Sequence, residues 1–227
     1  MSFAVFDFDS TLVEGSLGSA FEKWLTEKKV IPEEVLEALT KAREKYKNNE
    51  FSYKEHQKAI ILNRANWLKG KKQKEINNLV KEFSKEYKGF FHGAIDLVNF
   101  FKEKNFFLIL ISGAPKEWLK ELNFLLGFDV IAGQEFETKE GKYTGKLINK
   151  MWIEDIKEKI LLQIMKEKSL ERKGSFGFGD SEQDVFMLKL VESPFCINST
   201  EKLSGIAEEM NWKKFEMPFD ALNFLKK

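Results

Sequence analysis

Short, almost wholly apolar runs recur along the chain, and stretches with helical spacing separate them. Apolar runs bounded by turn residues are typical of parallel strands that are buried on both faces of a sheet. Four such runs and a weaker fifth lie at residues 3–8, 106–111, 130–132, 175–178 and 194–197. The helix-like segments lie at 94–104, 116–126, 153–168 and 183–191. Strands that alternate with helices predict an α/β fold with a doubly wound parallel sheet.

One long segment breaks this alternation. After the first strand the chain shows no convincing strand, only helical stretches at 20–28, 32–46, 53–68 and 73–87. The segment is flanked by four glycines, which suit chain reversals or hinges: Gly15, Gly18, Gly89 and Gly93. We therefore predict a small helical cap, residues 16–89, inserted into a core of residues 1–15 and 90–227. A β-hairpin is predicted over 136–144.

Composition narrows the class of protein. The 227 residues suffice for one large domain with a smaller insertion, and a hydrophobic fraction of 43% can fill a core. The formal net charge of +1 argues against a general nucleic-acid binder. The single cysteine, Cys196, excludes an intrachain disulfide and suits a reducing compartment. No signal-peptide pattern and no apolar stretch of about 18 residues is visible. We expect a cytoplasmic protein without a membrane partner, either a monomer or a homodimer.

Two aspartates close the first apolar run, in Phe6-Asp7-Phe8-Asp9-Ser10-Thr11-Leu12. Carboxylates are costly at the end of a buried strand unless something compensates their charge, and a divalent cation is the usual compensator. The pattern therefore predicts a Mg²⁺ and phosphate site. Asp7 is the expected nucleophile, which would form an aspartyl-phosphate and also bind Mg²⁺. Asp9 is expected to protonate the leaving oxygen, then to activate water, and to belong to the metal site.

Polar residues follow two further strands. Ser112-Gly113 follows the second strand, where the Ser112 hydroxyl and the Gly113 backbone N–H could bind phosphoryl oxygens as the next helix begins. Asp180 follows the fourth strand and would complete the Mg²⁺ carboxylates. Asp184 could orient a lysine or a metal-bound water. All these positions fall at the carboxyl ends of strands, where open α/β sheets hold their ligands.

A phosphoryl-transfer site also needs a cation to neutralise the nucleophile and the phosphate. Lys157 begins the helix that leads into the fourth strand, and we assign it this role. Lys150 and Lys159 lie close by in the sequence and are rival candidates.

These motifs, in this order along the chain, resemble the haloacid dehalogenase superfamily of phosphohydrolases, and within it the phosphoserine phosphatase-like branch. The resemblance covers the core, and the cap is similar in position and helicity only. It implies Mg²⁺-dependent hydrolysis of a small phosphorylated metabolite through an aspartyl-phosphate. It also implies phosphate contacts from five residues: Phe8, Thr11, Ser112, Gly113 and Lys157.

The chain differs from that branch at the positions whose side chains would recognise the substrate. Phosphoserine phosphatases carry a glutamate about nine residues after the nucleophile to hold the substrate amine, and here Ser16 stands there, with Glu14 nearby. They also use a cap arginine for the substrate carboxylate, and the comparable stretch offers Lys58 and then Arg64. Phosphoserine, other phosphorylated amino acids or amino alcohols, and sugar phosphates all stay open as substrates.

Three other functions use similar residues. A phosphotransferase would share the aspartyl-phosphate but pass the phosphoryl group to another acceptor. A signalling receiver also places aspartates, a hydroxyl residue and a lysine on an α/β sheet, but its phosphoacceptor lies on a later strand. A non-catalytic phosphate-binding protein would have lost a catalytic position, and none is lost here. The two histidines, His56 and His92, are expected to be surface residues rather than ligands.

Overall fold

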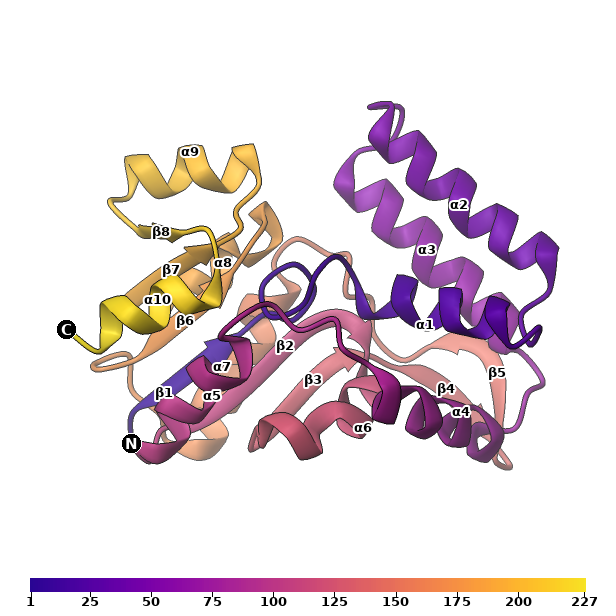
Figure 1. Ribbon diagram of the computed structural model, residues 1–227, viewed down its shortest axis with the longest axis horizontal. Coiled ribbons are helices and arrows are strands. Elements are labelled where there is room, and N and C mark those ends of the chain that lie inside the picture. Colours follow the sequence, from indigo (N-terminus) through magenta and orange to yellow (C-terminus); the bar gives the residue numbers. More distant parts are fainter.

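The computed structural model describes residues 1–227, and a six-stranded parallel sheet runs through its centre (Figure 1). The strands are ordered β3-β2-β1-β6-β7-β8. Their bounds are Phe3–Phe6 (β1), Phe107–Pro115 (β2), Val130–Gln134 (β3), Phe176–Gly179 (β6), Ser193–Ile197 (β7) and Lys213–Phe215 (β8). Each neighbouring pair is parallel. The predicted α/β class and parallel sheet are confirmed, and β8 is an additional edge strand.

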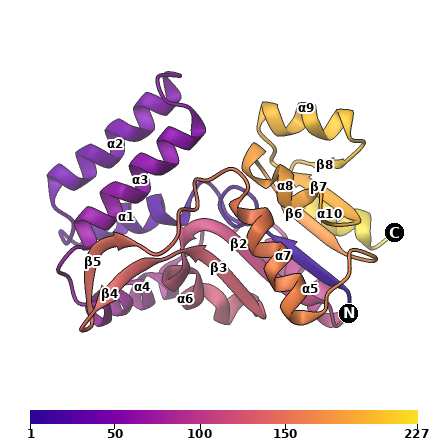
Figure 2. The ribbon, with the colours of Figure 1, turned by 180° about the vertical axis from the view of Figure 1, so that it is seen from behind.

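Side chains of the central strand β1 alternate between two hydrophobic cores. Ala4 and Phe6 face one core, while Phe3 and Val5 face the other, and all four are fully buried. Helices α5 (Ala94–Glu103), α6 (Lys116–Leu126) and α10 (Pro218–Leu225) contribute to the first core. Helices α7 (Ile156–Lys168), α8 (Val185–Leu188) and α9 (Glu201–Glu209) contribute to the second. Figure 2, seen from behind, shows α7 in front of the sheet. Because helices cover both faces of the sheet, the strands are buried on both sides and appear in the sequence as continuous apolar runs.

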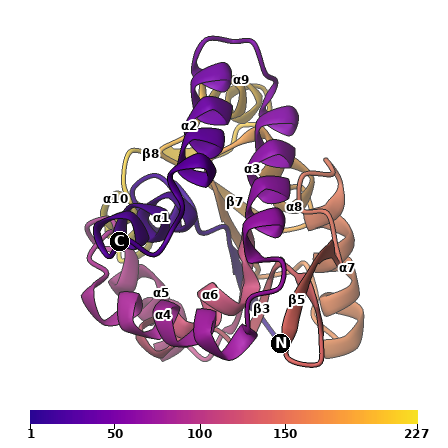
Figure 3. The ribbon, with the colours of Figure 1, turned by 90° about the vertical axis from the view of Figure 1, so that its right-hand side faces the viewer.

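The predicted insertion is helical. It comprises α1 (Leu17–Glu27), α2 (Glu33–Lys47), α3 (Tyr53–Leu68) and α4 (Gln73–Glu86). Figure 3 shows α2 and α3 side by side, and Figure 1 shows the pair standing away from the sheet. A capping box begins α3, since Ser52 Oγ accepts from the Glu55 N–H and the Glu55 carboxylate accepts from the Ser52 N–H.

The predicted hairpin forms from β4 (Phe136–Lys139) and β5 (Lys142–Leu147), and it is bound to the insertion (Figure 2). The Gly70 N–H donates to the Tyr143 carbonyl over 2.8 Å, and the Tyr143 N–H donates to the Lys71 carbonyl over 3.0 Å. The Gln73 N–H donates to the Gly141 carbonyl over 2.8 Å. Helix α4 also packs on α6 of the core. The base of the helical insertion is therefore joined to the rest of the molecule by more than its two linkers.

Several predicted boundaries differ from the structure. The strand expected at 106–111 continues to Pro115, because Pro115 still pairs with Gln134 of β3 after an irregularity. The helix expected at 183–191 shrinks to a 3₁₀ turn, Glu182–Asp184, followed by the short α8. The helix expected at 153–168 begins at Ile156. None of the helices has the length and apolar character needed to cross a membrane.

Candidate active site

The central strands β1, β2 and β6 end at the same edge of the sheet, and a cavity of about 350 Å³ lies over that edge. Its core side is lined by the side chains of five of the predicted residues: Asp7, Asp9, Ser112, Lys157 and Asp180. Gly113 also lines the cavity, and the opposite side is formed by residues of α2 and α3. A cavity of this size suits a small metabolite.

Lys157 lies between two aspartates. Its Nζ donates to Asp7 Oδ1 over 2.7 Å and to Asp184 Oδ1 over 2.6 Å, and its side chain is only 7% exposed. The rival lysines lie elsewhere, since Lys159 pairs with Asp155 near the surface and Lys150 is exposed. Of the three lysines weighed from the sequence, only Lys157 contacts the proposed nucleophile.

A buried acidic cluster completes the core side of the site. Carboxylate oxygens of Asp7, Asp180 and Asp184 lie within 4.8 Å of one another. With Lys157, these groups carry a net charge of −2 when all are ionised. Oxygen ligands with this excess of negative charge fit a hard divalent cation, because a buried uncompensated charge is costly.

The cluster differs from the carboxylates expected from the sequence, which were Asp7, Asp9 and Asp180. Asp9 Oδ1 instead accepts the Leu17 N–H over 2.8 Å at the start of α1, and Asp184 joins the other two. Asp184 Oδ2 also accepts the N–H groups of Asp180 and Ser181 over 3.1 Å each. Asp184 therefore holds both the loop after β6 and Lys157.

The cluster shifts the acidity of its own members. Burial raises the pKa of Asp7 to about 7, although the Lys157 ammonium opposes the shift. Burial and the carboxylates of Asp184 and Asp7 raise the pKa of Asp180 well above its ordinary value. Burial alone would lower the pKa of Lys157, but Asp184 and Asp7 hold it above the ordinary value. Without a cation, the protein therefore favours protons on Asp7 and Asp180.

Asp9 is placed to carry a proton toward the cavity. Burial raises the pKa of its carboxyl above the usual range, although the Leu17 N–H opposes the shift. The sequence left open whether crowding or nearby positive charge would dominate, and in the structure burial does. A raised pKa suits a carboxyl group that acts first as an acid and then as a base.

Ser112 and Gly113 line the cavity from the irregular end of β2. Ser112 Oγ accepts the Ala114 N–H over 3.1 Å, and its hydroxyl hydrogen stays available to a ligand. A Cβ atom at Gly113 would face Gln57 Oε1 of α3 at 3.8 Å. The following helix begins only at Lys116, so Ser112 and Gly113 lie within the strand and not where the helix begins, as the sequence had suggested.

Two residues implied by the resemblance do not line the cavity. The Phe8 ring is fully buried and packs edge-on against Phe90. Thr11 is fully buried, and its Oγ1 has no hydrogen-bond partner. Ser10 lines the cavity instead, with a φ of 58°, a left-handed conformation that non-glycine residues seldom adopt.

The cap side holds residues that the sequence did not single out as ligands. Arg43 and Tyr46 come from α2, and Tyr53 and His56 come from α3. The His56 ring is half-buried and stacks on Tyr46 with 4.8 Å between centroids, so it lies deeper than the surface position expected from the sequence. Burial, and then Asp180, raises the pKa of Tyr53 well above its ordinary value, which keeps its hydroxyl neutral. In the sequence these residues are recognisable only as parts of amphipathic helices, and that pattern does not indicate which side chains line the cavity.

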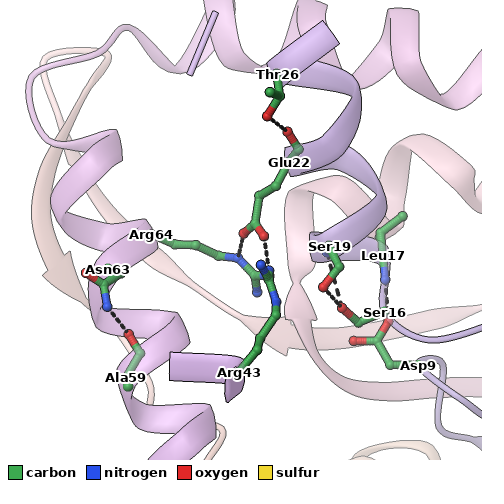
Figure 4. Close-up of polar contacts among 10 residues, drawn as sticks. All are labelled: Asp9, Ser16, Leu17, Ser19, Glu22, Thr26, Arg43, Ala59, Asn63 and Arg64. Atoms are coloured by element: carbon green, nitrogen blue, oxygen red, sulfur yellow. Dashed lines mark hydrogen bonds and ion pairs between the residues drawn. The ribbon is translucent and has the colours of Figure 1, made fainter. Parts of the chain in front are cut away.

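A buried ion-pair network supports the cap side (Figure 4). Arg64 Nε lies 2.7 Å from Glu22 Oε1, and Arg43 contacts the other oxygen of the same carboxylate. The Glu22 and Arg64 side chains are almost completely buried, whereas Arg43 is 26% exposed. Arg64 and Lys58, the cap cations expected from the sequence to read the substrate, do not line the cavity. Arg43 does.

Gly18 allows Arg64 to lie close to α1. A Cβ atom at Gly18 would lie 1.9 Å from Arg64 Nη2, so any side chain must displace the guanidinium from Glu22. We expect Gly18→Ala to lower the free energy of unfolding by roughly 1–3 kcal/mol, as measured by urea denaturation. Gly205→Ala in α9 is the matched control, because no atom lies within 4 Å of its Cβ position and alanine favours helix there. Equal effects at both positions would contradict the steric argument.

Comparisons with known proteins find related sequences and similar folds. A family model described as haloacid dehalogenase-like hydrolase matches residues 4–189. A phosphoserine phosphatase of Archaeoglobus fulgidus is 24% identical over 204 residues, which is 90% of this chain but 54% of that protein. A histidinol-phosphatase of Neisseria meningitidis is 26% identical, over 92% of this chain and 96% of that one. A substrate-bound phosphoserine phosphatase structure has a TM-score of 0.70 at 20% identity, with 98% of this chain and 97% of that chain covered.

Proposed function

The chain belongs to the haloacid dehalogenase-like hydrolase family, and on that premise we propose that it is a phosphomonoesterase acting on a small phosphorylated metabolite. Membership confirms the resemblance drawn from the motifs. The contact that carries the proposal is the hydrogen bond from Lys157 Nζ to Asp7 Oδ1, within the acidic cluster and at the wall of the cavity. It combines a candidate nucleophile, a fixed cation and a place for the substrate in one site.

The proposed reaction has two steps. In the first, an Asp7 carboxylate oxygen attacks phosphorus, the bond from phosphorus to the leaving oxygen breaks, and that oxygen takes a proton from Asp9. In the second, Asp9 takes a proton from water, the water oxygen attacks phosphorus, and the Asp7 carboxylate is released with inorganic phosphate. Lys157 stabilises the negative charge near Asp7 throughout, and Ser112 and Gly113 donate hydrogen bonds to phosphoryl oxygens.

Mg²⁺ is the proposed cofactor, and the donor set fits it. Asp7 and Asp180 would hold the cation, and Asp184 would fix the position of the loop and of Lys157. When bound, Mg²⁺ supplies positive charge that stabilises the phosphoryl oxygens as they accumulate negative charge.

The choice between hydrolysis and transfer to another acceptor depends on what reaches Asp7 after the first step. The names of the similar proteins favour hydrolysis. The test is release of inorganic phosphate from a panel of phosphomonoesters by the purified protein with Mg²⁺, with and without an added acceptor alcohol. Phosphate release that keeps pace with alcohol release supports a phosphatase. Phosphorylation of the added alcohol in place of phosphate release would identify a phosphotransferase.

Binding of the cation should depend on pH in a defined direction. The pKa of Asp7 is about 7 in the folded protein and 3.8 without the fold, so the cation-free folded state binds more protons between these values. Its stability therefore falls as pH rises from about 4 to about 7, by an amount on the order of 4 kcal/mol. Mg²⁺ should raise the melting temperature more at pH 7.5 than at pH 5, because protons compete with it at the lower pH.

The matched control for this pH dependence is Asp7→Asn, which removes the titrating group. We expect the variant to show a flatter pH dependence of stability and a smaller response to Mg²⁺ in differential scanning fluorimetry. A Mg²⁺ response of the same size at both pH values, or one unaffected by the substitution, would place the cation elsewhere.

A further inference from the structure

The side of the cavity away from the acidic cluster carries a net positive charge. Arg43 lines the cavity there, and behind it lie the buried Arg64 guanidinium and the Glu22 carboxylate, so the three groups together carry a net charge of +1. Both oxygens of Glu22 are taken, one by each arginine (Figure 4). This half of the site therefore has no free carboxylate with which to hold a cationic group of the substrate.

Arg43 has N–H donors that are not used in hydrogen bonds within the protein. Its only hydrogen bond goes to Glu22, and its side chain is partly exposed where it lines the cavity. A guanidinium presents five N–H donors in a planar fork that matches a carboxylate, so the group keeps an unpaired edge for a ligand. Glu22 holds Arg43 in place from behind, which reduces the entropy that binding would cost.

His56 supplies an independent sign of a missing ligand. Both of its ring nitrogens are buried and neither has a hydrogen-bond partner, although the ring lines the cavity. Unpartnered buried polar atoms are rare, because each forfeits a hydrogen bond that water would otherwise provide. Burial, followed by the charges of Arg43 and Arg64, lowers the pKa of His56 to about 4. At neutral pH the imidazole is uncharged and offers one N–H donor and one acceptor.

From these observations we propose that Arg43 and His56 form a subsite for a carboxylate on the leaving group, and that the substrate is a phosphorylated hydroxy acid without an amine. The inference rests on the proposed phosphatase function and specifies its substrate class. Arg43 would bind the carboxylate with its free N–H groups, and His56 would donate one further hydrogen bond. An ammonium group at the same place would face Arg43 with no carboxylate to offset the repulsion.

The test uses four phosphomonoesters of similar size that differ in the groups on the leaving alcohol. Phosphorylated 3-hydroxypropanoate carries a carboxylate only, and O-phosphoserine carries a carboxylate and an amine. O-phosphoethanolamine carries an amine only, and propyl phosphate carries neither. We expect kcat/KM for the carboxylate-only ester to exceed that for propyl phosphate by about 10- to 100-fold, the usual effect of hydrogen bonds to a charged group. We expect it to exceed that for phosphoserine by about 10-fold or more, and phosphoethanolamine to be the poorest of the four.

Variants connect the preference to the proposed subsite. In Arg43→Gln the ratio of kcat/KM between the carboxylate-only ester and propyl phosphate should fall about 10-fold or more. Lys41→Gln, which removes the same charge from an exposed position on the same helix, should leave the ratio unchanged. His56→Phe keeps an aromatic ring against Tyr46 but removes both nitrogens, and it should lower the ratio by several-fold. This variant tests the subsite separately if Arg43→Gln fails to fold.

The outcomes separate the two proposals. Hydrolysis of propyl phosphate together with a preference for phosphoserine or phosphoethanolamine overturns the subsite and leaves the phosphatase standing. A carboxylate preference that survives both Arg43→Gln and His56→Phe also overturns the subsite. Failure to hydrolyse any of the four esters with Mg²⁺ overturns both proposals.

Discussion

Asp7→Asn should abolish phosphoester hydrolysis and leave the fold intact. An amide has nearly the same shape as a carboxylate but is a far poorer nucleophile, so the rate should fall roughly 10⁴-fold or more. The initial rate of p-nitrophenyl phosphate hydrolysis at saturating Mg²⁺ measures the effect, and circular dichroism confirms the fold. The variant should also melt at a higher temperature than the wild type without Mg²⁺ at pH 7.5, because it removes one of three buried carboxylates that repel one another.

The control for that substitution is Asp96→Asn on α5, an exposed aspartate with no part in the site. We expect its rate and melting temperature to match those of the wild type. If Asp7→Asn keeps more than about a tenth of the activity, a loss of less than about 1.4 kcal/mol in transition-state stabilisation, Asp7 is not the nucleophile. The two-step scheme would then fail.

Lys157→Met should lower kcat by about 10²- to 10³-fold, since it removes a positive charge held beside the reacting carboxylate. It should also destabilise the protein by about 3 kcal/mol, because Asp7 and Asp184 would stay buried without their counter-charge. The rate is measured with p-nitrophenyl phosphate and the stability by urea denaturation. Lys159→Met is the matched control, since Lys159 pairs only with Asp155 near the surface.

A double substitution separates the two roles of Lys157. Adding Asp184→Asn to Lys157→Met removes one of the two stranded carboxylates, so it should restore part of the lost stability. It should not restore the rate, because no cation then lies beside Asp7. Recovery of activity in the double variant would mean that Lys157 acts only by balancing charge in the fold. A loss of rate in Lys159→Met of the same size would mean that the wrong lysine has been assigned.

The core of the fold could be predicted because each of its buried strands is marked by a run of apolar residues in its own sequence. Residues 3–6 are buried on both faces, so the apolar run shows the strand without any knowledge of its neighbours. Edge strand β8 has no such signal, since Lys213 and Lys214 are exposed and only Phe215 packs inward. The end of β2 was missed because Ser112-Gly113 has the composition of a turn, while its strand conformation depends on pairing with β3.

The residues of the site likewise fall into those that the sequence predicts and those whose positions depend on the three-dimensional packing. Asp7, Ser112 and Asp180 converge because parallel strands end at one edge, which follows from the order of the motifs, and Lys157 reaches them from the first turn of α7. The position of the Asp9 side chain depends on the first turn of α1, and the place of Asp184 depends on the loop after β6. Arg43 and His56 belong to two helices whose rotation about their axes is set by packing in three dimensions. No short motif marks that rotation, so the cap side of the cavity was not predicted.

The hydrogen bonds between the β4–β5 hairpin and residues 70–73 restrict the motions that can open the cavity to solvent. A rigid-body rotation of the whole insertion would break several of these backbone hydrogen bonds at once and would shift α4 along α6. Bending confined to the free end of the α2–α3 pair breaks none of these contacts. Exchange of substrate and product should therefore depend on fluctuations near residues 47–52. Amide hydrogen exchange should be fast at that tip and slow at the hairpin.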